Sequence, residues 1–397
     1  MLETRIAKEL AYISQAGLAR RITELYFVNP AQAQDRTGKT YLVLASNNYL
    51  GFTHAPEVIE AASRAALKFG TGSSGSRLTT GGTFIASELE KRLADFKHSE
   101  SALVFNTGYM TNLGVLYGLL QTGDVVFSDE LNHASIIDGC RISRCKVVVY
   151  KHNDMADLQR LLETEIVTGQ RFIVTDGVFS MDGDIADLPS LAVLKKQFNA
   201  FLIVDDAHGV GVIGNDGSGT ASHYGLTDVI DLQVGTLSKA LAAEGGYVAG
   251  KKILIDYLIN RSRPFIFSTA LAPATLAAAN AALLLLQTQA SKYLDFLRAN
   301  SRLMRRLLLE GGLNVVEGIT PIIPVVIGEA GLTMQFADRL KSKGILVSGI
   351  RPPTVPRGES RLRITVTAAH CEEQLRQAAQ IITALWQELK HGEKKEG

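Results

Sequence analysis

Short apolar runs alternate with helix-patterned stretches through the middle of this 397-residue chain. The runs expected to be strands are 102–105, 125–127, 147–150, 172–175, 201–204, 229–236 and 246–249. Strands of a parallel sheet read as nearly continuous apolar runs, because helices cover both faces of such a sheet. Alternation of strands and helices over about 150 residues is typical of a doubly wound sheet. The sequence therefore predicts an α/β fold built on a mostly parallel sheet.

Two acids and a histidine follow the apolar run 201–204. Acids at the carboxyl end of a parallel strand lie where open α/β sheets bind ligands. Asp205 and His208 are three residues apart in an expected turn, so both side chains can address one flat ring. A carboxylate beside a pyridinium nitrogen keeps that nitrogen protonated and makes the ring an electron sink. The alternative is that these acids only cap the following loop.

A lysine ends the next expected strand, 34 residues after Asp205. Lys239 has small and hydroxylated neighbours, which leave room for a flat molecule to approach its amine. A partly desolvated lysine has a lowered pKa, and its neutral amine is a nucleophile toward aldehydes such as pyridoxal 5'-phosphate (PLP). A single lysine is usually a solvated surface charge. Together with Asp205 and His208, however, Lys239 predicts a PLP site.

Other polar residues are placed near the same expected edge of the sheet. Residues 106–109 form a strand–glycine–helix junction around Gly108, a geometry that holds phosphate on helix N-terminal amides, although Tyr109 can equally be a core residue. His133 lies between a strand and a helix and can stack on a flat ring, although a lone histidine is more often structural. Asn47 offers a donor and an acceptor just after the apolar run 42–45.

Several segments outside these strands carry candidate ligand-binding groups. The amphipathic segment 2–25 contains Arg20, which is either solvated or able to bind a carboxylate across a dimer interface. The glycine-rich stretch 71–82 predicts a functional loop rather than a linker. In the proline-rich loop 351–358, Thr354 and the arginines either grip an anion or cover a sheet edge.

The pattern of elements changes near residue 283 and divides the chain into three parts. Residues 1–48 are expected to form a helix and a ribbon-like arm, and residues 49–283 a large α/β domain. Separate strands and helices in residues 284–397 predict a small α+β domain.

Charge, hydropathy and cysteine usage exclude several classes of protein. A net charge of +1 and a pI near 7.7 give no case for nucleic-acid binding. The most apolar stretch, 271–286, contains Pro273 and Asn280, which predicts a buried helix rather than a membrane span. The three cysteines have neither a metal-ligand nor a disulfide pattern, and the first ten residues carry charges that the apolar core of a signal peptide lacks. These features predict a cytoplasmic protein.

Six short motifs together resemble the α-oxoamine synthase family of fold-type-I PLP enzymes, over essentially the whole chain. The motifs are S-N-N-Y-L-G at 46–51, G-S-R-L at 75–78, N-H-A-S at 132–135, V-F-S-M-D-G at 178–183, D-D-A-H-G at 205–209 and T-L-S-K at 236–239. The resemblance implies a seven-stranded type of sheet and a homodimer whose active sites lie between the subunits. Ala86 departs from the family, which often has a histidine there, and this leaves fine substrate preference open.

The resemblance also implies a role for each candidate residue. Lys239 would hold PLP as a Schiff base and act as general base. The other cofactor contacts implied are Asp205 at the ring nitrogen, His208 and Ser180 near the phenolic oxygen, His133 on the ring face, Gly108, Tyr109 and Thr236 at the phosphate, and Ser268 and Thr269 at the partner subunit's phosphate. The substrate contacts implied are Arg20, Asn47, His133, Thr354 and Arg361, with Arg361 as the clamp for the amino-acid carboxylate.

Two stretches, 351–356 and 361–370, most resemble the biotin-pathway branch of the family. That branch condenses L-alanine with a pimeloyl thioester, either pimeloyl-CoA or a pimeloyl carrier protein. Within the family, the alternative is a glycine C-acetyltransferase acting on glycine and acetyl-CoA. Outside it, the alternatives are an aminotransferase, which has the same fold and lysine, and a cofactor-binding regulator, for which neither terminus offers a DNA-binding segment.

Overall fold

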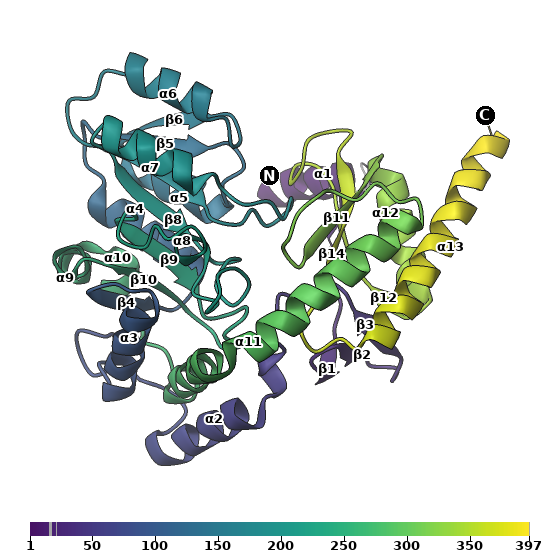
Figure 1. Ribbon diagram of the computed structural model, residues 1–397, viewed down its shortest axis with the longest axis horizontal. Helices are drawn as coiled ribbons and strands as arrows, with labels where there is room; N and C mark the ends of the chain where they lie inside the picture. The colour runs from purple at the N-terminus through teal and green to yellow at the C-terminus, as the bar shows by residue number, and fades with distance from the viewer. Residues whose placement is uncertain (16–17, 21, 397) are drawn as a thin grey trace.

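A seven-stranded sheet forms the centre of the larger part of the molecule (Figure 1). The structure is a computed structural model that describes residues 1–15, 18–20 and 22–396, with side chains to residue 390. The strand order is β4 (Ser101–Phe105), β10 (Gly246–Gly250), β9 (Leu232–Thr236), β8 (Phe201–Asp205), β7 (Arg171–Asp176), β5 (Val125–Asp129) and β6 (Lys146–Tyr150). Only β10 runs antiparallel to its neighbours in this sheet. The prediction of a mostly parallel, seven-stranded sheet is confirmed.

Helices cover both faces of this sheet. On one face Val126 packs in a core with Leu116 and Ile255, and on the other face Phe127 packs with Leu158 and Leu191. The helices are α4 (Gly108–Leu119), α5 (Ala134–Ser143), α6 (Met155–Thr164), α7 (Leu188–Gln197), α8 (Thr220–His223), α9 (Lys252–Arg261) and α10 (Arg263–Ile266). Alternate residues of one strand thus enter two different cores, as a doubly wound sheet requires.

One long helix connects the two parts of the molecule. Helix α11 (Pro273–Glu310) runs from the large sheet toward the smaller sheets (Figure 1), and its backbone is non-helical at Gln289 (φ −134°, ψ 26°). It packs against α2 (Pro56–Phe69) and α3 (Phe84–Phe96). The apolar stretch 271–286 contributes buried leucines and alanines to the core there, as expected for a buried helix. The proposed domain division at residues 283–284 falls inside α11, before the Gln289 kink.

The smaller part combines both ends of the chain. Its antiparallel sheet has the order β11 (Ile322–Gly328), β14 (Ser360–Thr365) and β13 (Ser348–Ile350). A second sheet, β1 (Tyr26–Asn29), β2 (Gln32–Gln34), β3 (Thr40–Val43) and β12 (Ile345–Leu346), joins the N-terminal ribbon to this part through a parallel β3–β12 pair. Helices α12 (Ala330–Ser342) and α13 (Glu372–Glu396) complete it, and Phe336 stacks on Trp386 between them.

Three short segments differ from the expectations or were not assigned. Among the described residues of the amphipathic segment 2–25, only α1 (Leu2–Gln15) is helical, and the short helix α10 directly precedes the segment with Ser268 and Thr269. A 3-10 turn, η1 (Phe52–His54), follows the motif at 46–51. Within the described residues, no helix is both long and apolar enough to cross a membrane.

Candidate active site

Eight of the ten cofactor residues expected from the sequence lie around one cavity of about 220 Å³ at the carboxyl ends of β7, β8 and β9. The expected residues that line it are Gly108, Tyr109, His133, Ser180, Asp205, His208, Thr236 and Lys239. Ser268 and Thr269 do not line it. This edge of the sheet is where open α/β folds bind ligands, because side chains from several parallel strands converge there.

Lys239 lies three residues after the end of β9 and lines the cavity. Burial lowers the pKa of its amine to about 8, although the carboxylates of Asp205 and Asp176 act in the opposite direction. The guanidinium of Arg363 lowers that pKa further. Lys239 therefore has a much larger neutral fraction near neutral pH than a surface lysine, as a nucleophilic amine needs.

The two adjacent acids, Asp205 and Asp206, have different roles. Asp205 is buried at the end of β8, where Asn112 Nδ2 donates to its Oδ2 at 2.6 Å and Ala207 N–H donates to its Oδ1 at 3.0 Å. Asp206 points away and forms a fully buried ion pair with Lys97, with Nζ 3.0 Å from Oδ2. Of these two acids, Asp205 lines the cavity and can meet a ring nitrogen, whereas Asp206 does not line it.

His208 is held by a tyrosine from the segment before α2. Tyr49 Oη lies 2.6 Å from His208 Nδ1, and both side chains are buried. Burial keeps the pKa of His208 well below its ordinary value, and the nearby positive charges of Lys239 and Arg363 act in the same direction. The imidazole is therefore neutral at physiological pH. Since Tyr49 can donate to Nδ1, Nε2 is free to carry the proton.

His133 is both the cap of a helix and a wall of the cavity. Its ring Nδ1 accepts from the backbone N–H of Ser135 at 3.2 Å and lies 2.7 Å from Ser135 Oγ. The backbone N–H of His133 donates to Asp176 Oδ2 at 2.9 Å. Desolvation lowers the pKa of His133, Asp205 opposes this effect and Lys239 adds to it. The ring is thus neutral and fixed at the N-terminus of α5.

The end of the cavity near α4 suits a phosphate. Thr107 caps α4, and a Cβ on Gly108 would lie 3.4 Å from the Thr236 side chain, so glycine keeps this end open. Thr236 donates its hydroxyl to Gly245 O at 2.9 Å and its oxygen lies 2.7 Å from Ser238 Oγ, and Ser238 is the more exposed of the two residues. Tyr109 is half-exposed, and its hydroxyl donates to Asp138 rather than entering the core. Helix amides and a hydroxyl are the donors that a phosphate binds.

The substrate arginine expected from the sequence is two residues from the one that the structure places near the site. Arg361 is buried and forms ion pairs with Asp182 and, at 3.1 Å, with Glu359. Arg363 instead donates to Asn47 Oδ1 at 3.1 Å and to the carbonyl of Ser180. Its charge also acts on the pKa values of Lys239 and His208. The structure thus brings Asn47 and Arg363 to the site, whereas Arg361 ties down the loop that contains Asp182.

The remaining expected residues are farther out. Thr354 lines a second cavity of about 570 Å³, which shares His133 and Ser180 with the first. Arg20 is exposed and lines neither cavity. Thr269 is exposed as well. Asn106 Nδ2 donates to the backbone carbonyl of Thr269 at 2.8 Å and so holds this segment. Ala86 is buried in the core on α3 and does not face the cavity.

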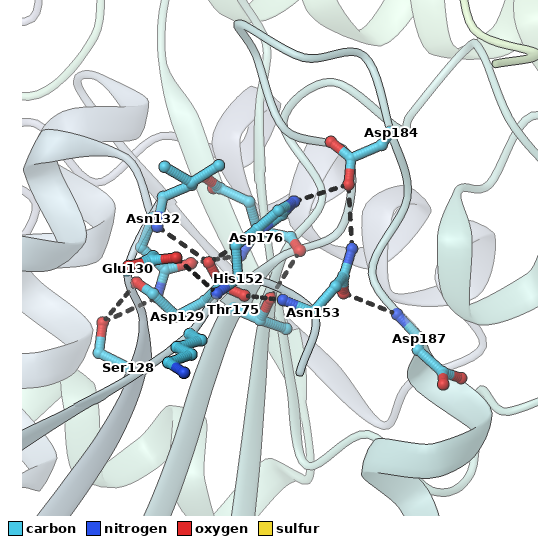
Figure 2. Close-up of polar contacts among 12 residues, drawn as sticks. Ser128, Asp129, Glu130, Asn132, His152, Asn153, Thr175, Asp176, Asp184 and Asp187 are labelled. Atoms are coloured by element: carbon cyan, nitrogen blue, oxygen red, sulfur yellow. Dashed lines mark hydrogen bonds and ion pairs between the residues drawn. The ribbon is translucent and has the colours of Figure 1, made fainter. Parts of the chain in front are cut away.

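A charged histidine supports the loop beside the cavity (Figure 2). His152 Nδ1 lies 3.0 Å from Asp129 Oδ1, and its Nε2 lies 2.8 Å from Asp184 Oδ2. Burial opposes the charge on His152, but the hydrogen bonds to Asp129 and Asp184 outweigh it and raise its pKa to about 10. Asn153 Nδ2 also donates to Asp184 Oδ2, at 2.9 Å. The end of loop 178–184, which contains Ser180, is therefore anchored to β5 through a protonated imidazole.

The lining of the first cavity fits PLP. It offers a reactive amine on Lys239, a buried acid on Asp205 for the ring nitrogen, and a glycine-lined helix N-terminus at Gly108 for the phosphate. A phosphate, a ring nitrogen and an aldehyde carbon each have a partner of suitable chemistry. Among the described residues, no group of three or more His, Cys, Asp or Glu side chains is arranged to hold a metal ion.

Sequence reasoning missed three residues at this cavity: Asn112 lines it, and Tyr49 and Arg363 bond to His208 and Ser180, which line it. Asn112 is an uncharged residue inside a helix, so no pattern marks it. Tyr49 belongs to the motif at 46–51, which indicates the family but gives Tyr49 no role. The predicted carboxylate clamp was Arg361 and not Arg363, although both are on β14 and their side chains project from the same face. Periodicity identifies such a pair but does not say which member reaches the site.

Known families and proteins match this chain over most of its length. The model of the family described as aminotransferase class I and II matches residues 39–382. A relative from Lysinibacillus sphaericus named 8-amino-7-oxononanoate synthase is 47% identical, over 94% of this chain and 96% of the relative. One of the same name from Trichlorobacter lovleyi is 49% identical, over 97% and 98%. A solved variant of serine palmitoyltransferase from S. paucimobilis with bound PLP–myriocin matches with a TM-score of 0.91 and 31% identity, over 97% of both chains.

Proposed function

The chain belongs to the α-oxoamine synthase family of PLP enzymes, and from this membership we propose that it catalyses the 8-amino-7-oxononanoate synthase reaction. L-Alanine and a pimeloyl thioester condense, and the products are 8-amino-7-oxononanoate, carbon dioxide and a free thiol. The observation that carries the proposal is the Lys239 amine, with its pKa lowered to about 8, in one cavity with Asp205, His133 and His208. The names of the relatives support this pair of substrates.

When bound, PLP withdraws electrons from the α-carbon of an amino acid and so favours loss of a proton or of carbon dioxide from it. Lys239 holds the cofactor and then, as a neutral amine, takes the α-proton of alanine. Its low pKa suits this role, because a general base acts best with a pKa near the working pH. After the acyl group has been transferred and carbon dioxide lost, the protonated amine returns a proton to the same carbon.

The other lining residues set the charges around the ring. Asp205 holds a proton at the ring nitrogen, which a neutral partner would not retain as well. His208 offers its Nε2 proton to the phenolic oxygen, because Tyr49 occupies Nδ1. His133 lines both cavities and would cover the ring face. These roles follow from position and chemistry.

We assign the clamp for the alanine carboxylate to Arg363 and Asn47 rather than to Arg361. The guanidinium of Arg363 has no acidic partner among the described residues, whereas Arg361 has two. A buried guanidinium that bonds only neutral oxygens is suited to receive an anion. Asn47 is 3.1 Å from Arg363 and orients it.

The second cavity is the proposed place for the acyl chain. It adjoins the first through His133 and Ser180, and much of its wall is apolar, with Leu131, Ile137 and Val355 among the lining residues. A seven-carbon acyl chain is mostly apolar and gains from burial there. Thr354 supplies a hydroxyl near the outer end.

We also propose that the active unit is a homodimer with shared sites. Phe267 is an exposed aromatic residue directly before Ser268 and Thr269, and Phe84 and Leu78 are exposed as well. Helix α1 is amphipathic, yet none of its residues is buried within the chain. A second copy of the chain would cover these apolar side chains and bring Ser268 and Thr269 to the partner's phosphate. The free cysteines fit the reducing cytoplasm that we propose as its location.

The reaction is tested by measuring carbon dioxide and thiol release from PLP-loaded enzyme. L-Alanine and glycine are crossed with pimeloyl, acetyl and succinyl thioesters of both coenzyme A and a carrier protein. We expect fast release with alanine and a pimeloyl thioester. A preference for glycine with acetyl-CoA would instead indicate a glycine C-acetyltransferase. Pyruvate formed from alanine without thiol release would indicate an aminotransferase.

A further inference from the structure

Asn112 on α4 is a buried amide between the two groups that flank the cofactor site. Its Nδ2 donates to Asp205 Oδ2 at 2.6 Å and to Ser135 Oγ at 2.9 Å. The side chain is 2% exposed, so water does not replace these bonds. One amide group, with its two N–H protons, therefore contacts both the acid at the ring nitrogen and the support of the ring-facing histidine.

The hydrogen bond from Asn112 to Ser135 determines the tautomer of His133. Ser135 Oγ accepts from Asn112, so its single proton is free to go to His133 Nδ1, 2.7 Å away. Ser135 N–H is also directed at Nδ1, at 3.2 Å. With donors on Nδ1, the neutral ring carries its proton on Nε2. The amide of Asn112 thereby selects the tautomer of His133 through one hydroxyl.

The hydrogen bond from Asn112 to Asp205 determines which of two neighbouring carboxylates, Asp205 or Asp176, carries the negative charge. Asp205 and Asp176 are paired in register on β8 and β7, and both are buried. Two neighbouring buried carboxylates do not both ionise readily, so the one with more donors keeps the charge. The carboxylate of Asp205 accepts from the Asn112 amide and the Ala207 N–H, whereas the carboxylate of Asp176 accepts from the backbone N–H of His133. Burial and the charge of Asp205 raise the pKa of Asp176 well above its ordinary value.

We propose that Asn112 is a positioning residue that keeps the negative charge on Asp205 and the proton on Nε2 of His133, so that bound PLP is protonated at its ring nitrogen. This inference rests on the proposed PLP chemistry and adds a residue that acts through Asp205. Asn112 lines the cofactor cavity beside Asp205, and its amide donates to Asp205 and to Ser135. It therefore acts on the charge of the ring through these two residues.

The test replaces Asn112 and reads the protonation of the ring directly. PLP labelled with ¹⁵N in the ring is bound to the wild-type enzyme and to Asn112→Leu and Asn112→Ala, and the ¹⁵N chemical shift is recorded by NMR at pH 7.5. Both variants remove the donor to Asp205 without adding a charge, and leucine is close to asparagine in shape. We expect the signal of both to move toward the unprotonated position, and the Kd for PLP to rise at least tenfold.

Asn300→Leu is the matched control. Asn300 is also buried in a helix and donates through Nδ2 to two carbonyls, of Thr367 and His370, but it does not line the cofactor cavity. We expect this variant to lose thermal stability while the ¹⁵N shift stays unchanged and the Kd stays within twofold. If one Asn112 variant fails to fold, the other decides the question.

A wild-type ¹⁵N shift in both Asn112 variants would overturn the proposal. So would a change of equal size in Asn300→Leu, because the effect would then be one of general stability. Failure of the wild-type chain to bind PLP would instead remove the proposed function, and with it this inference. Binding of PLP without turnover of the pimeloyl thioester would leave the role of Asn112 standing and alter only the substrate assignment.

Discussion

Tyr49 Oη lies 2.6 Å from Nδ1 of His208, and both side chains are buried. Tyr49 comes from the segment that follows the N-terminal ribbon, whereas His208 comes from the turn after β8. Since burial holds the pKa of His208 well below its ordinary value, the ring is a neutral acceptor at Nδ1. The hydrogen bond therefore connects segments that are distant in sequence and determines which nitrogen of His208 faces the cofactor site.

Tyr49→Phe removes this hydrogen bond while keeping the ring. His208 Nδ1 then lacks a donor in a buried place, which we expect to lower the free energy of unfolding by about 1–3 kcal/mol. The tautomer is no longer fixed, so kcat should fall by about tenfold, on the order of 1.4 kcal/mol. Urea unfolding and steady-state kinetics measure the two effects. Unchanged kcat with reduced stability would show that the pair is only structural.

Lys239 should react with PLP at lower pH than an ordinary lysine. Burial lowers the pKa of its amine to about 8, so its neutral fraction rises as pH increases through 8. We expect the second-order rate of Schiff-base formation by the cofactor-free enzyme to rise with a midpoint near pH 8. Lys239→Ala should lose the Schiff-base absorbance and all turnover. A midpoint near 10.5 would mean that the amine is fully solvated.

The alternation of strands and helices predicted the central sheet because the same physical pattern, apolar on both faces, recurs in each strand. The polar residues at the strand ends, Asp205, His133 and Lys239, converged as expected, since parallel strands present their carboxyl ends at one edge. Antiparallel β10 differs, because the chain between β9 and β10 makes only a short connection without a crossover helix.

The parts that sequence did not predict depend on tertiary contacts. Nothing near Asn112 indicates that α4 would bring its amide to Asp205, 93 residues away in the chain. The choice between Arg361 and Arg363 depends on where Asp182 and Glu359 lie, which local pattern does not encode. Motifs therefore located the cavity, whereas the residues that orient its lining needed coordinates.

The buried pair of Lys97 and Asp206 should be important for stability and not for chemistry. Lys97→Met leaves the carboxylate of Asp206 buried with only Thr220 as a side-chain partner. Removing one member of a buried pair typically costs about 3–5 kcal/mol. We expect a loss of that order in urea unfolding, with kcat per folded molecule unchanged. Restoration of stability in Lys97→Met combined with Asp206→Leu would show that the loss came from the unpaired charge.

His152 should make stability depend on pH in the alkaline range. Its folded pKa is raised to about 10, against about 6.5 for an unfolded histidine. The contribution of the charged ring is therefore fully present below pH 6.5 and is lost as pH rises through about 10. His152→Gln should be less stable than wild type by about 2 kcal/mol at pH 6. This difference should shrink above pH 10.

The control for this experiment is His98→Gln. His98 is mostly exposed, and its contact with Asp216 is 3.6 Å long, so its loss should change stability little at any pH. Unfolding curves at pH 6, 8 and 10.5 for the three proteins separate the two sites. A constant difference between His152→Gln and wild type from pH 6 to 10.5 would contradict a protonated His152.

The two arginines of β14 should separate substrate binding from loop support. Among the described residues, Arg363 bonds only neutral oxygens of Ser180, Asn47 and Thr365, so it is able to receive the alanine carboxylate. Arg363→Lys keeps the charge but loses the planar fork, and we expect KM for L-alanine to rise about tenfold or more. Arg361→Lys should leave this KM within about twofold, because Arg361 is paired with Asp182 and Glu359.

These two variants form a matched pair, since each places lysine on the same face of one strand. The measurement is steady-state turnover with L-alanine varied at saturating pimeloyl thioester, together with thermal unfolding. Arg361→Lys should chiefly reduce thermal stability, because its guanidinium ties loop 178–184 to β14. If KM for alanine instead rose with Arg361→Lys and not with Arg363→Lys, the carboxylate clamp would have to be Arg361, and loop 178–184 would have to release it when substrate binds.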